Sequence, residues 1–336
     1  MTDPLVTIVI PVRDDARHLP GCLAAVAAQD HPHARLEVIV VVDGATGDDS
    51  AIVAYDLLRS SQYQRALVLV NADGGTPKNL NMGLAAARGS VLCRVDARSL
   101  IPPDYVRRCA ELVTTRRDLA VVGGAQVAVA PRHDAIGRGI ARALNNRWGM
   151  GGSRYRRGAG SGPADTVYLG AFRTRDLRSV GGWDAALTTN QDFDLNRRLG
   201  RRGAVWFEAG LPVGYVPRST VRDLYRQYRR FGRWKVRYWR HTHDHPRPRQ
   251  LALLVGVPLS VVAAAVVLVL MPPVGQAVLV FAVVAAAATV ELAGSRRPTG
   301  GPAVHGWSAL ALGAVGMGWL GGAWAELLHR KGGRGA

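Results

Sequence analysis

Three aspartates lie where apolar runs end, and their type and spacing point to a ligand-binding edge. Each run predicts a buried β-strand. The aspartates are Asp15 after the run 5–12, Asp43 after 36–42, and Asp96 after 91–95. Open α/β sheets bind ligands at the carboxyl ends of their strands, so three carboxylates at neighbouring strand ends favour a ligand site. Aspartate is also common in turns for conformational reasons alone, and that simpler interpretation stays open.

A fourth carboxylate, Asp192, is predicted to lie in the first turn of a helix over 191–201. Backbone N–H groups and the helix dipole stabilise an anion at that position. Asp192 is therefore either an ordinary first-turn acid or a base that the helix holds in place for catalysis.

The elements that must position these residues alternate along the first part of the chain. Apolar runs predict four strands, at 5–12, 36–42, 66–70 and 91–95. The segments between and after them predict four helices, at 16–28, 46–59, 77–88 and 102–115. This alternation implies right-handed crossovers and therefore an α/β domain, over 1–217, with a doubly wound, mostly parallel sheet. Uninterrupted apolar strands fit a sheet that is covered on both faces.

A strongly basic segment, 218–249, follows this domain. It holds 11 Lys and Arg residues against two acids, in a chain with a formal net charge of +18. Val221, Leu224, Tyr228 and Phe231 recur at roughly helical spacing, which predicts a basic amphipathic helix on a membrane. Alternating aromatics and arginines also suit single-stranded nucleic acid. The adjoining apolar segments favour an anionic membrane surface instead, and no nucleic-acid partner is expected.

The C-terminal region is almost free of charge. Three apolar stretches, Leu251–Met271, Val274–Leu292 and Val304–Leu328, approach or exceed the ~20 residues that a helix needs to cross a bilayer. We expect a membrane region over 250–329 with two or three spanning helices, and a basic tail over 330–336. The positive-inside rule favours a multi-pass inner-membrane protein with its catalytic domain in the cytosol. Three spans would place the basic tail outside, so the role of the third stretch stays open.

A series of short motifs runs through the chain in a specific order. It comprises Pro11-Val12-Arg13-Asp14-Asp15, Val42-Asp43-Gly44 with Asp48, Leu80-Asn81-Met82-Gly83-Leu84, Val95-Asp96-Ala97, Gly181-Gly182-Trp183-Asp184, Asn190-Gln191-Asp192 and Gln227-Tyr228-Arg229-Arg230-Phe231. In order and spacing the chain resembles a family 2 glycosyltransferase of the GT-A fold. The segment from Gly149 to Leu199 is similar to the subgroup of the succinoglycan biosynthesis glucosyltransferase.

The resemblance implies an enzyme that transfers a sugar with inversion from a nucleoside-diphosphate sugar, with a UDP-sugar as the expected donor. The acceptor would be a hydroxyl group of a lipid-linked sugar or polysaccharide, in cell-surface or exopolysaccharide synthesis. Inversion needs a single displacement, so one carboxylate suffices as the base. The departing diphosphate needs a metal ion or cationic side chains to stabilise its charge.

The resemblance also implies roles for individual residues. Asp192 would be the general base. The nucleotide-sugar pocket would comprise Pro11, Asp15, Asp43, Asp96 and Arg98. Residues of the Gln-x-x-Arg-Trp motif, with Phe in place of Trp, would bind the acceptor or the diphosphate, and they are Gln227, Arg230, Phe231 and the nearby Trp234.

Two positions depart from the family pattern. Gln191 stands where the family has an acid before the base, and Arg98 stands where the Asp-x-Asp motif has its second acid. A guanidinium stays protonated and cannot ligate a metal, which puts binding of Mg²⁺ or Mn²⁺ through Asp96 in doubt. One hypothesis is that Arg98 supplies the positive charge in the metal's place. The other is that Arg98 points away and a metal still binds through Asp96 and the diphosphate.

These departures leave a second function open. A catalytically degenerate relative would bind nucleotide sugars or act as a scaffold at the membrane without transferring sugar. Turnover of a nucleotide sugar would distinguish an active glycosyltransferase from such a degenerate relative.

Overall fold

A computed structural model describes residues 3–147, 160–270, 272–294 and 300–329. It divides into two compact units. The first comprises Met1–Val129 and Gly152–Val216, and the second Ala130–Gly151 and Pro217–Ala336. The expected basic tail, 330–336, lies outside the described residues.

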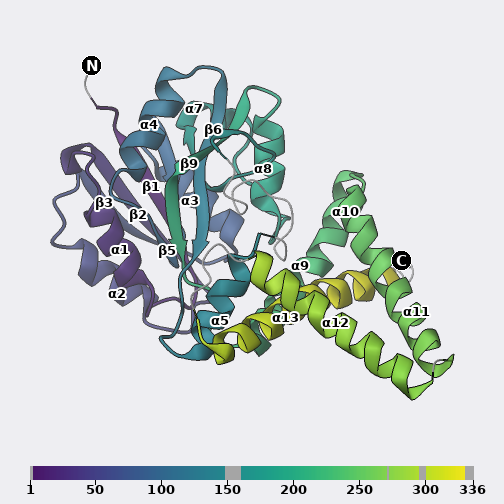
Figure 1. The fold of residues 1–336 in the computed structure, drawn as a ribbon. Helices are drawn as coiled ribbons and strands as arrows, with labels where there is room; N and C mark the ends of the chain where they lie inside the picture. Colours follow the sequence, from purple (N-terminus) through teal and green to yellow (C-terminus); the bar gives the residue numbers. More distant parts are fainter. Residues whose placement is uncertain (1–2, 148–159, 271, 295–299, 330–336) are drawn as a thin grey trace. The chain divides into compact units, whose positions relative to one another are not determined.

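The first unit is built on one sheet with the strand order β3-β2-β1-β4-β8-β6-β9-β5. Figure 1 shows this sheet with the helices of the first unit around it. Its first half is parallel, as the sequence predicts, with β1 (Val6–Val12) between β2 (Leu36–Asp43) and β4 (Val91–Arg94). The strand β3 (Arg65–Asn71) extends this half on the far side of β2. Parallel strands with right-handed crossovers bring Asp15, Asp43 and Asp96 to one edge of the sheet.

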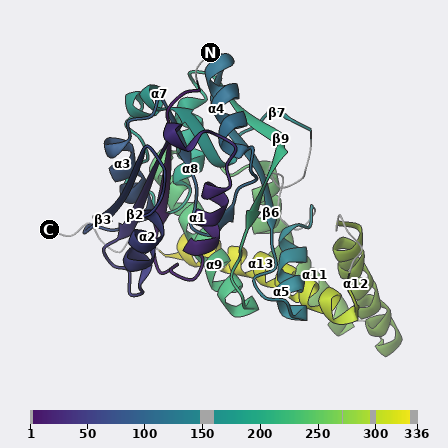
Figure 2. The ribbon, with the colours of Figure 1, turned by 90° about the vertical axis from the view of Figure 1, so that its left-hand side faces the viewer.

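Helices cover both faces of this sheet (Figure 2). One core packs the strands against α1 (Leu19–Ala27), α2 (Ser50–Leu58) and α4 (Tyr105–Thr115). The other packs them against α3 (Thr76–Ala86), α7 (Thr174–Ser179) and α8 (Gln191–Leu199). Alternate residues of β1 divide between the two cores, since Ile8 and Ile10 belong to the first and Val9 to the second. The doubly wound α/β architecture is therefore confirmed.

The second half of the sheet is mixed. The strand β8 (Tyr168–Arg173) runs antiparallel to β4 and to β6 (Leu119–Ala128). The long strand β9 (Ala204–Tyr215) is parallel to β6, and two short strands, β5 (Ser99–Leu100) and β7 (Gly162–Pro163), run antiparallel to it. A single 3-10 turn at His33–Arg35 precedes β2.

The second unit is helical. It comprises α5 (Ala135–Leu144), α9 (Val221–Thr242), α10 (Pro248–Leu251), a π-helical turn at Ala252–Gly256 that continues into α11 (Val257–Leu270), α12 (Pro273–Gly294) and α13 (Pro302–Leu328). The helix α9 begins at a Thr220 cap, whose hydroxyl accepts a hydrogen bond from Asp223 N. Among the described residues, three helices are long and apolar enough to cross a membrane, over 252–270, 273–294 and 302–328.

Candidate active site

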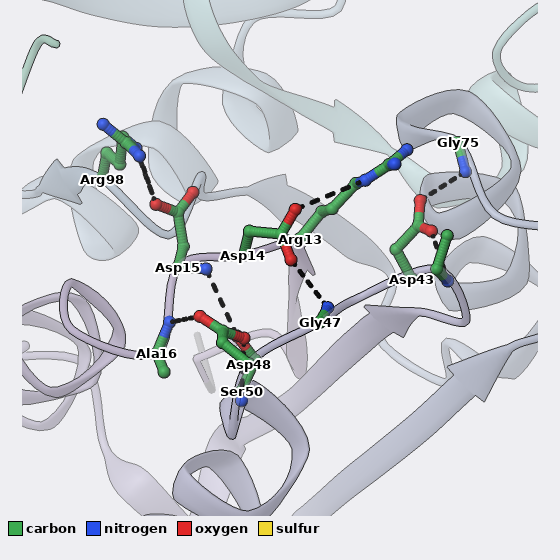
Figure 3. A network of polar contacts seen from close by, with 11 residues as sticks. Arg13, Asp14, Asp15, Ala16, Asp43, Gly47, Asp48, Ser50, Gly75 and Arg98 are labelled. Carbon is green, nitrogen blue, oxygen red and sulfur yellow. Dashed lines mark hydrogen bonds and ion pairs between the residues drawn. The ribbon is translucent and has the colours of Figure 1, made fainter.

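The loops after β1 and β2 form one side of the candidate site (Figure 3). Asp14 adopts a left-handed backbone conformation (φ 52°), and its Oδ1 accepts a hydrogen bond of 2.8 Å from Gly47 N. Asp48, in the loop after β2, contacts the loop after β1, since its Oδ2 accepts a hydrogen bond of 2.9 Å from Ala16 N. Burial raises the pKa of Asp48, but hydrogen bonds from Ser50 and Ala16 outweigh that effect and lower it. The two loops are thus held together by the carboxylates of Asp14 and Asp48.

Asp15 faces the loop after β4. Its Oδ1 accepts a hydrogen bond of 2.7 Å from Arg98 Nε and forms an ion pair of 2.6 Å with Arg98 Nη2 (Figure 3). Only 11% of the Arg98 side chain and 16% of the Asp15 side chain are exposed. Arg98 Nη1 is buried and has no hydrogen-bond partner among the described residues. Arg98 therefore points toward the strand-end aspartates rather than away from them.

Asp43, the last residue of β2, is buried and fixes two turns. Its Oδ1 accepts from Ala45 N at 2.9 Å, and its Oδ2 accepts from Gly75 N at 2.5 Å (Figure 3). The approach needs glycine, because Gly74 has φ +61° and a Cβ there would lie 2.7 Å from Asp43 Oδ1. The structure therefore gives Asp43 the role of a turn aspartate, and its predicted nucleoside contact stays a prediction.

A buried arginine joins the carboxylate after β4, Asp96, to the first-turn carboxylate of α8, Asp192. Arg94, the last residue of β4, is 5% exposed. Its Nε donates to Asp96 Oδ1 at 2.7 Å and its Nη2 donates to Asp96 Oδ2 at 3.2 Å. Its Nη1 pairs with Asp192 Oδ1. Burial alone would lower the pKa of Arg94, but Asp192 and Asp96 raise it above its usual range, so the guanidinium remains a cation.

Asp192 lies in the first turn of α8, as predicted, after Asn190 in a left-handed conformation (φ 67°). Its side chain is 38% exposed and can therefore be reached from solvent. Partial desolvation of the carboxylate by the surrounding protein raises the pKa of Asp192, and Arg94 opposes that rise only in part. A raised pKa suits a general base, because the carboxylate then accepts a proton more readily.

The turn before α8 is fixed by Arg198. Its Nη1 and Nη2 donate to the carbonyls of Val180 and Gly182, at 2.7 and 2.8 Å. Trp183 in this turn is buried, and Asn81 of α3 both donates to its carbonyl and accepts from its N–H. These bonds tie the last turn of α8 to the turn at 180–183 and tie that turn to α3, while Arg198 Nε also donates to Asp194 in the first turn of α8 at 2.8 Å.

The residues present do not form an ordinary metal site. No group of three or more His, Cys, Asp or Glu that could hold a metal ion occurs among the described residues. Both oxygens of Asp96 are hydrogen-bonded to Arg94, and Arg98 occupies the place of a second acid. Arg94 pairs with Asp96 and Asp192, and Arg98 pairs with Asp15, so these carboxylates already have cationic side-chain partners.

Arg94 is the residue that the sequence analysis missed. A charged residue in the apolar run 91–95 is the signal that could have found it, since a buried arginine needs anionic partners. Pro11 lies in β1 beside Val41 of β2. The predicted motif residues Gln227, Arg230, Phe231 and Trp234 lie on α9 in the second unit, and their part in the site stays a prediction.

Comparison with known proteins identifies the family. The sequence profile of Glycosyl transferase family 2 matches residues 7–175, and that of Glycosyl transferase family group 2 matches 92–292. The chain belongs to glycosyl transferase family 2. The enzyme class inferred from the motifs, a glycosyltransferase, is thereby confirmed.

Relatives span most of the chain. The succinoglycan biosynthesis protein ExoA of Rhizobium meliloti is 28% identical over 328 residues, which cover 96% of this chain and 94% of the relative. A dolichyl N-acetyl-α-D-glucosaminyl phosphate 3-β-D-2,3-diacetamido-2,3-dideoxy-β-D-glucuronosyltransferase of Methanococcus voltae is 22% identical and covers 68% of this chain and 71% of the relative. The predicted similarity to the succinoglycan subgroup is therefore confirmed.

A solved structure has the same fold. The mannosyltransferase PcManGT from Pyrobaculum calidifontis, in complex with GDP-Man and Mn2+, superimposes with a TM-score of 0.63 at 17% identity. The match covers 98% of this chain and 89% of that structure. The GT-A fold expected from the sequence is confirmed.

Proposed function

We propose that this glycosyltransferase moves a sugar with inversion from a nucleoside-diphosphate sugar, with a UDP-sugar as the expected donor, to a hydroxyl group of a lipid-linked or polysaccharide acceptor. The observation that carries the proposal is the contact of Arg94 with both Asp96 and Asp192. It brings the carboxylate at the end of β4 and the first-turn acid of α8 into one site. The names of the relatives, which include a succinoglycan biosynthesis protein and a glucuronosyltransferase that acts on a dolichyl phosphate-linked sugar, support the acceptor class.

Asp192 acts as the general base. Its Oδ1 is paired with Arg94, so Oδ2 takes the proton of the acceptor hydroxyl. The acceptor oxygen attacks the anomeric carbon and forms the new glycosidic bond. The bond from that carbon to the diphosphate oxygen breaks, its electron pair leaves with the nucleoside diphosphate, and the anomeric configuration inverts.

Arg98 supplies fixed positive charge to the leaving diphosphate. Its guanidinium lies among the strand-end residues, is held by Asp15, and keeps a buried Nη1 without a partner among the described residues. A diphosphate oxygen can satisfy such a donor, and hydrogen bonds aimed at developing negative charge lower the barrier. No step in this proposal passes through a metal ion, because Asp96 is already paired with Arg94.

The enzyme works at an inner membrane with the first unit in the cytosol, where nucleotide sugars are made. Three apolar helices and the basic helix α9 support this location. The cations of α9 suit an anionic lipid surface. Pro11, Asp15, Asp43 and Asp96 would line the donor pocket, and Gln227, Arg230, Phe231 and Trp234 would meet the acceptor or the diphosphate.

The test is a donor screen on the full-length protein. Release of nucleoside diphosphate is measured with UDP- and GDP-sugars, with and without a polyprenyl-linked sugar acceptor, and in EDTA or in Mn²⁺. Asp192→Asn should abolish acceptor-dependent release but keep nucleotide binding. Asp56→Asn, which removes a carboxylate from the surface of α2, is the matched control and should keep full activity. Full turnover of Asp192→Asn would show that another group is the base.

The departures at Arg98 and Gln191 support one alternative, a degenerate relative that only binds nucleotide sugars. Gln191 is buried at the start of α8 beside Asp192. Tight nucleotide binding without turnover across the whole donor and acceptor panel would favour this second function.

A further inference from the structure

The third apolar helix, α13, differs from the two other candidate spans. In its most apolar stretch 39% of the residues are buried, against 6% for 252–270 and 12% for 273–294. Seven of the nine buried residues of α13, at 304, 308, 311, 315, 318, 322 and 326, recur every three or four positions, which defines one helix face. The nine buried residues are Val304, Ser308, Ala311, Val315, Gly318, Leu320, Gly322, Ala323 and Glu326. A helix with such a face packs against protein along its whole length.

The partner of the second half of α13 is the basic helix α9. A Cβ on Gly318 would lie 2.7 Å from Tyr225 O, and one on Gly322 would clash with Arg229 O. In return, a Cβ on Gly232 of α9 would clash with Trp319 O. Glycines on both helices therefore let the two backbones approach closely.

Ion pairs extend the same contact. Glu326 of α13 pairs with Arg237 at 3.0 Å and lies 3.7 Å from Arg240, both on α9. Arg240 Nη2 also donates to Leu327 O at 3.4 Å. The contacts between Tyr225 and Gly318 and between Arg240 and Leu327 show that the helices run alongside each other in the same direction.

The charge of α9 decides where this pair of helices can lie. Its eight cations between residues 221 and 242 are Arg222, Arg226, Arg229, Arg230, Arg233, Lys235, Arg237 and Arg240. Arginine and lysine inside a bilayer are costly and rare. The second half of α13, which packs against α9 from Gly318 to Leu327, is therefore expected to lie outside the hydrocarbon core together with α9.

The first half of α13 also packs against other helices of the second unit, α5 and α12. A Cβ on Gly139 of α5 would lie 2.5 Å from Trp307 Cβ and 2.9 Å from Ser308 N. His305 Nδ1 lies 3.0 Å from Glu291 Oε2, at the end of α12, and Glu291 also pairs with Arg142 of α5. Charged and polar side chains thus surround the start of α13 as well.

The remaining face of α13 is apolar and exposed. It carries Leu310, Met317, Trp324, Leu327 and Leu328. A helix that is apolar on one face and packed against a basic helix on the other suits the surface of a bilayer of anionic lipid. The adjoining helix α12 is a candidate span.

We propose that α13 lies along the membrane surface with α9 and that the chain crosses the bilayer only twice, through 252–270 and 273–294. His329, at the end of α13, is then on the same side as Gly301 at its start. The inference rests on the membrane location in the proposed function. It also keeps the basic C-terminus on the cytosolic side, as the positive-inside rule requires.

Three variants, each with one added cysteine, test the crossing number. Pro272→Cys, Gly301→Cys and His329→Cys are all at exposed positions, whereas the native Cys22, Cys93 and Cys109 are buried. The full-length variants are labelled with a membrane-impermeant maleimide in right-side-out and inverted vesicles, and total labelling is measured in detergent. We expect Pro272→Cys to react in right-side-out vesicles, and Gly301→Cys and His329→Cys to react only in inverted ones.

The outcomes separate this inference from the proposed location. Reaction of Gly301→Cys and His329→Cys in opposite vesicle types would overturn the inference, because α13 would then cross. Reaction of both in right-side-out vesicles would overturn the cytosolic orientation of the proposed function and still support two crossings.

A glycine pair tests the packing of α13 on α9 within the same protein. Gly322 contacts the backbone of Arg229, whereas an added Cβ at Gly316 of the same helix meets nothing within 4 Å. Gly322→Ala should lower the melting temperature of the detergent-solubilised protein by several degrees, and Gly316→Ala should leave it unchanged or raise it. Equal melting temperatures for the two variants would contradict the packing on α9.

Discussion

Arg94 pairs with Asp192 across 98 positions of sequence, while the same guanidinium holds Asp96 through bonds of 2.7 and 3.2 Å. Both carboxylates therefore share one buried cation. The orientation of the proposed base depends on a residue that touches neither substrate in the proposed reaction. Arg94 is a positioning residue in this scheme.

Replacing Arg94 should lower turnover more than it lowers donor binding. Arg94→Met leaves Asp192 without the partner that orients it, and a misplaced catalytic group costs about 100-fold in rate. Arg94→Lys keeps the charge but not the planar fork that reaches two carboxylates, so its loss should be smaller. Initial rates of nucleoside diphosphate release over a range of donor concentrations give kcat and KM separately.

Arg173 is the matched control for Arg94. It lies on β8, opposite Val91 of β4, is 15% exposed, and pairs with Asp176 outside the candidate site. Arg173→Met should destabilise the protein without a specific loss of kcat in the fraction that remains folded. Similar kcat values for Arg94→Met and Arg173→Met would show that Arg94 acts only on stability.

The pH dependence of kcat should report Asp192. Partial desolvation raises the pKa of this carboxyl, and a base is active only when deprotonated. Activity should therefore rise with pH through a midpoint above the usual aspartate range. Because Arg94 opposes the rise in pKa, Arg94→Met should move this acidic limb to still higher pH. A limb that stays in place in Arg94→Met would mean that a different group controls it.

Arg98 should act on the donor diphosphate. A charge-assisted hydrogen bond contributes about 1.5–3 kcal/mol, so Arg98→Ala should lower kcat/KM for the donor by about 10- to 100-fold. Activity of the unaltered enzyme should persist in EDTA. Arg107→Ala removes an exposed arginine that pairs with Asp30, and it should have no effect. Complete dependence on Mn²⁺ or Mg²⁺, together with full activity of Arg98→Ala, would contradict this role.

The sequence predicts the strands whose residues form an uninterrupted apolar run. The apolar runs gave β1, β2 and β4 within one or two residues, because strands covered on both faces contain little else. The sequence does not predict β9, since Glu208, Gly210 and Pro212 interrupt its pattern and many of its residues are only partly buried. It also does not predict α5, where Gly137 and Gly139 weaken the helical signal.

In the candidate site, too, some features could be predicted from the sequence and others could not. The strand-end positions of Asp15, Asp43 and Asp96 could be predicted, because parallel strands present their carboxyl ends at one edge. The partners of these residues could not, because they depend on side chains brought together by the fold. The pairing of Arg98 with Asp15 spans 83 positions, and no local pattern marks it.

Protonation of Glu37 should destabilise the first unit at low pH. This residue of β2 is 1% exposed, accepts 2.5 Å from Thr7 Oγ1 and 2.8 Å from Arg88 N, and pairs with Arg65 at 2.6 Å. Burial raises the pKa of Glu37, but these bonds outweigh it and hold the pKa below the usual value of 4.5. The stabilisation is therefore complete above pH 4.5 and is lost as the pH falls through the lowered pKa.

Glu37→Gln should remove this stabilisation at neutral pH. The change leaves Arg65, which is 26% exposed, without its anionic partner, and losing a hydrogen bond to a charged group costs about 1.5–3 kcal/mol. Thermal unfolding of the detergent-solubilised protein at pH 7 should show a clearly lower midpoint, with a smaller difference from the unaltered protein below pH 4. Asp56→Asn, which breaks an exposed pair with Arg59, should change the midpoint little at either pH. A Glu37→Gln midpoint equal to that of Asp56→Asn would mean that the buried pair contributes nothing to folding.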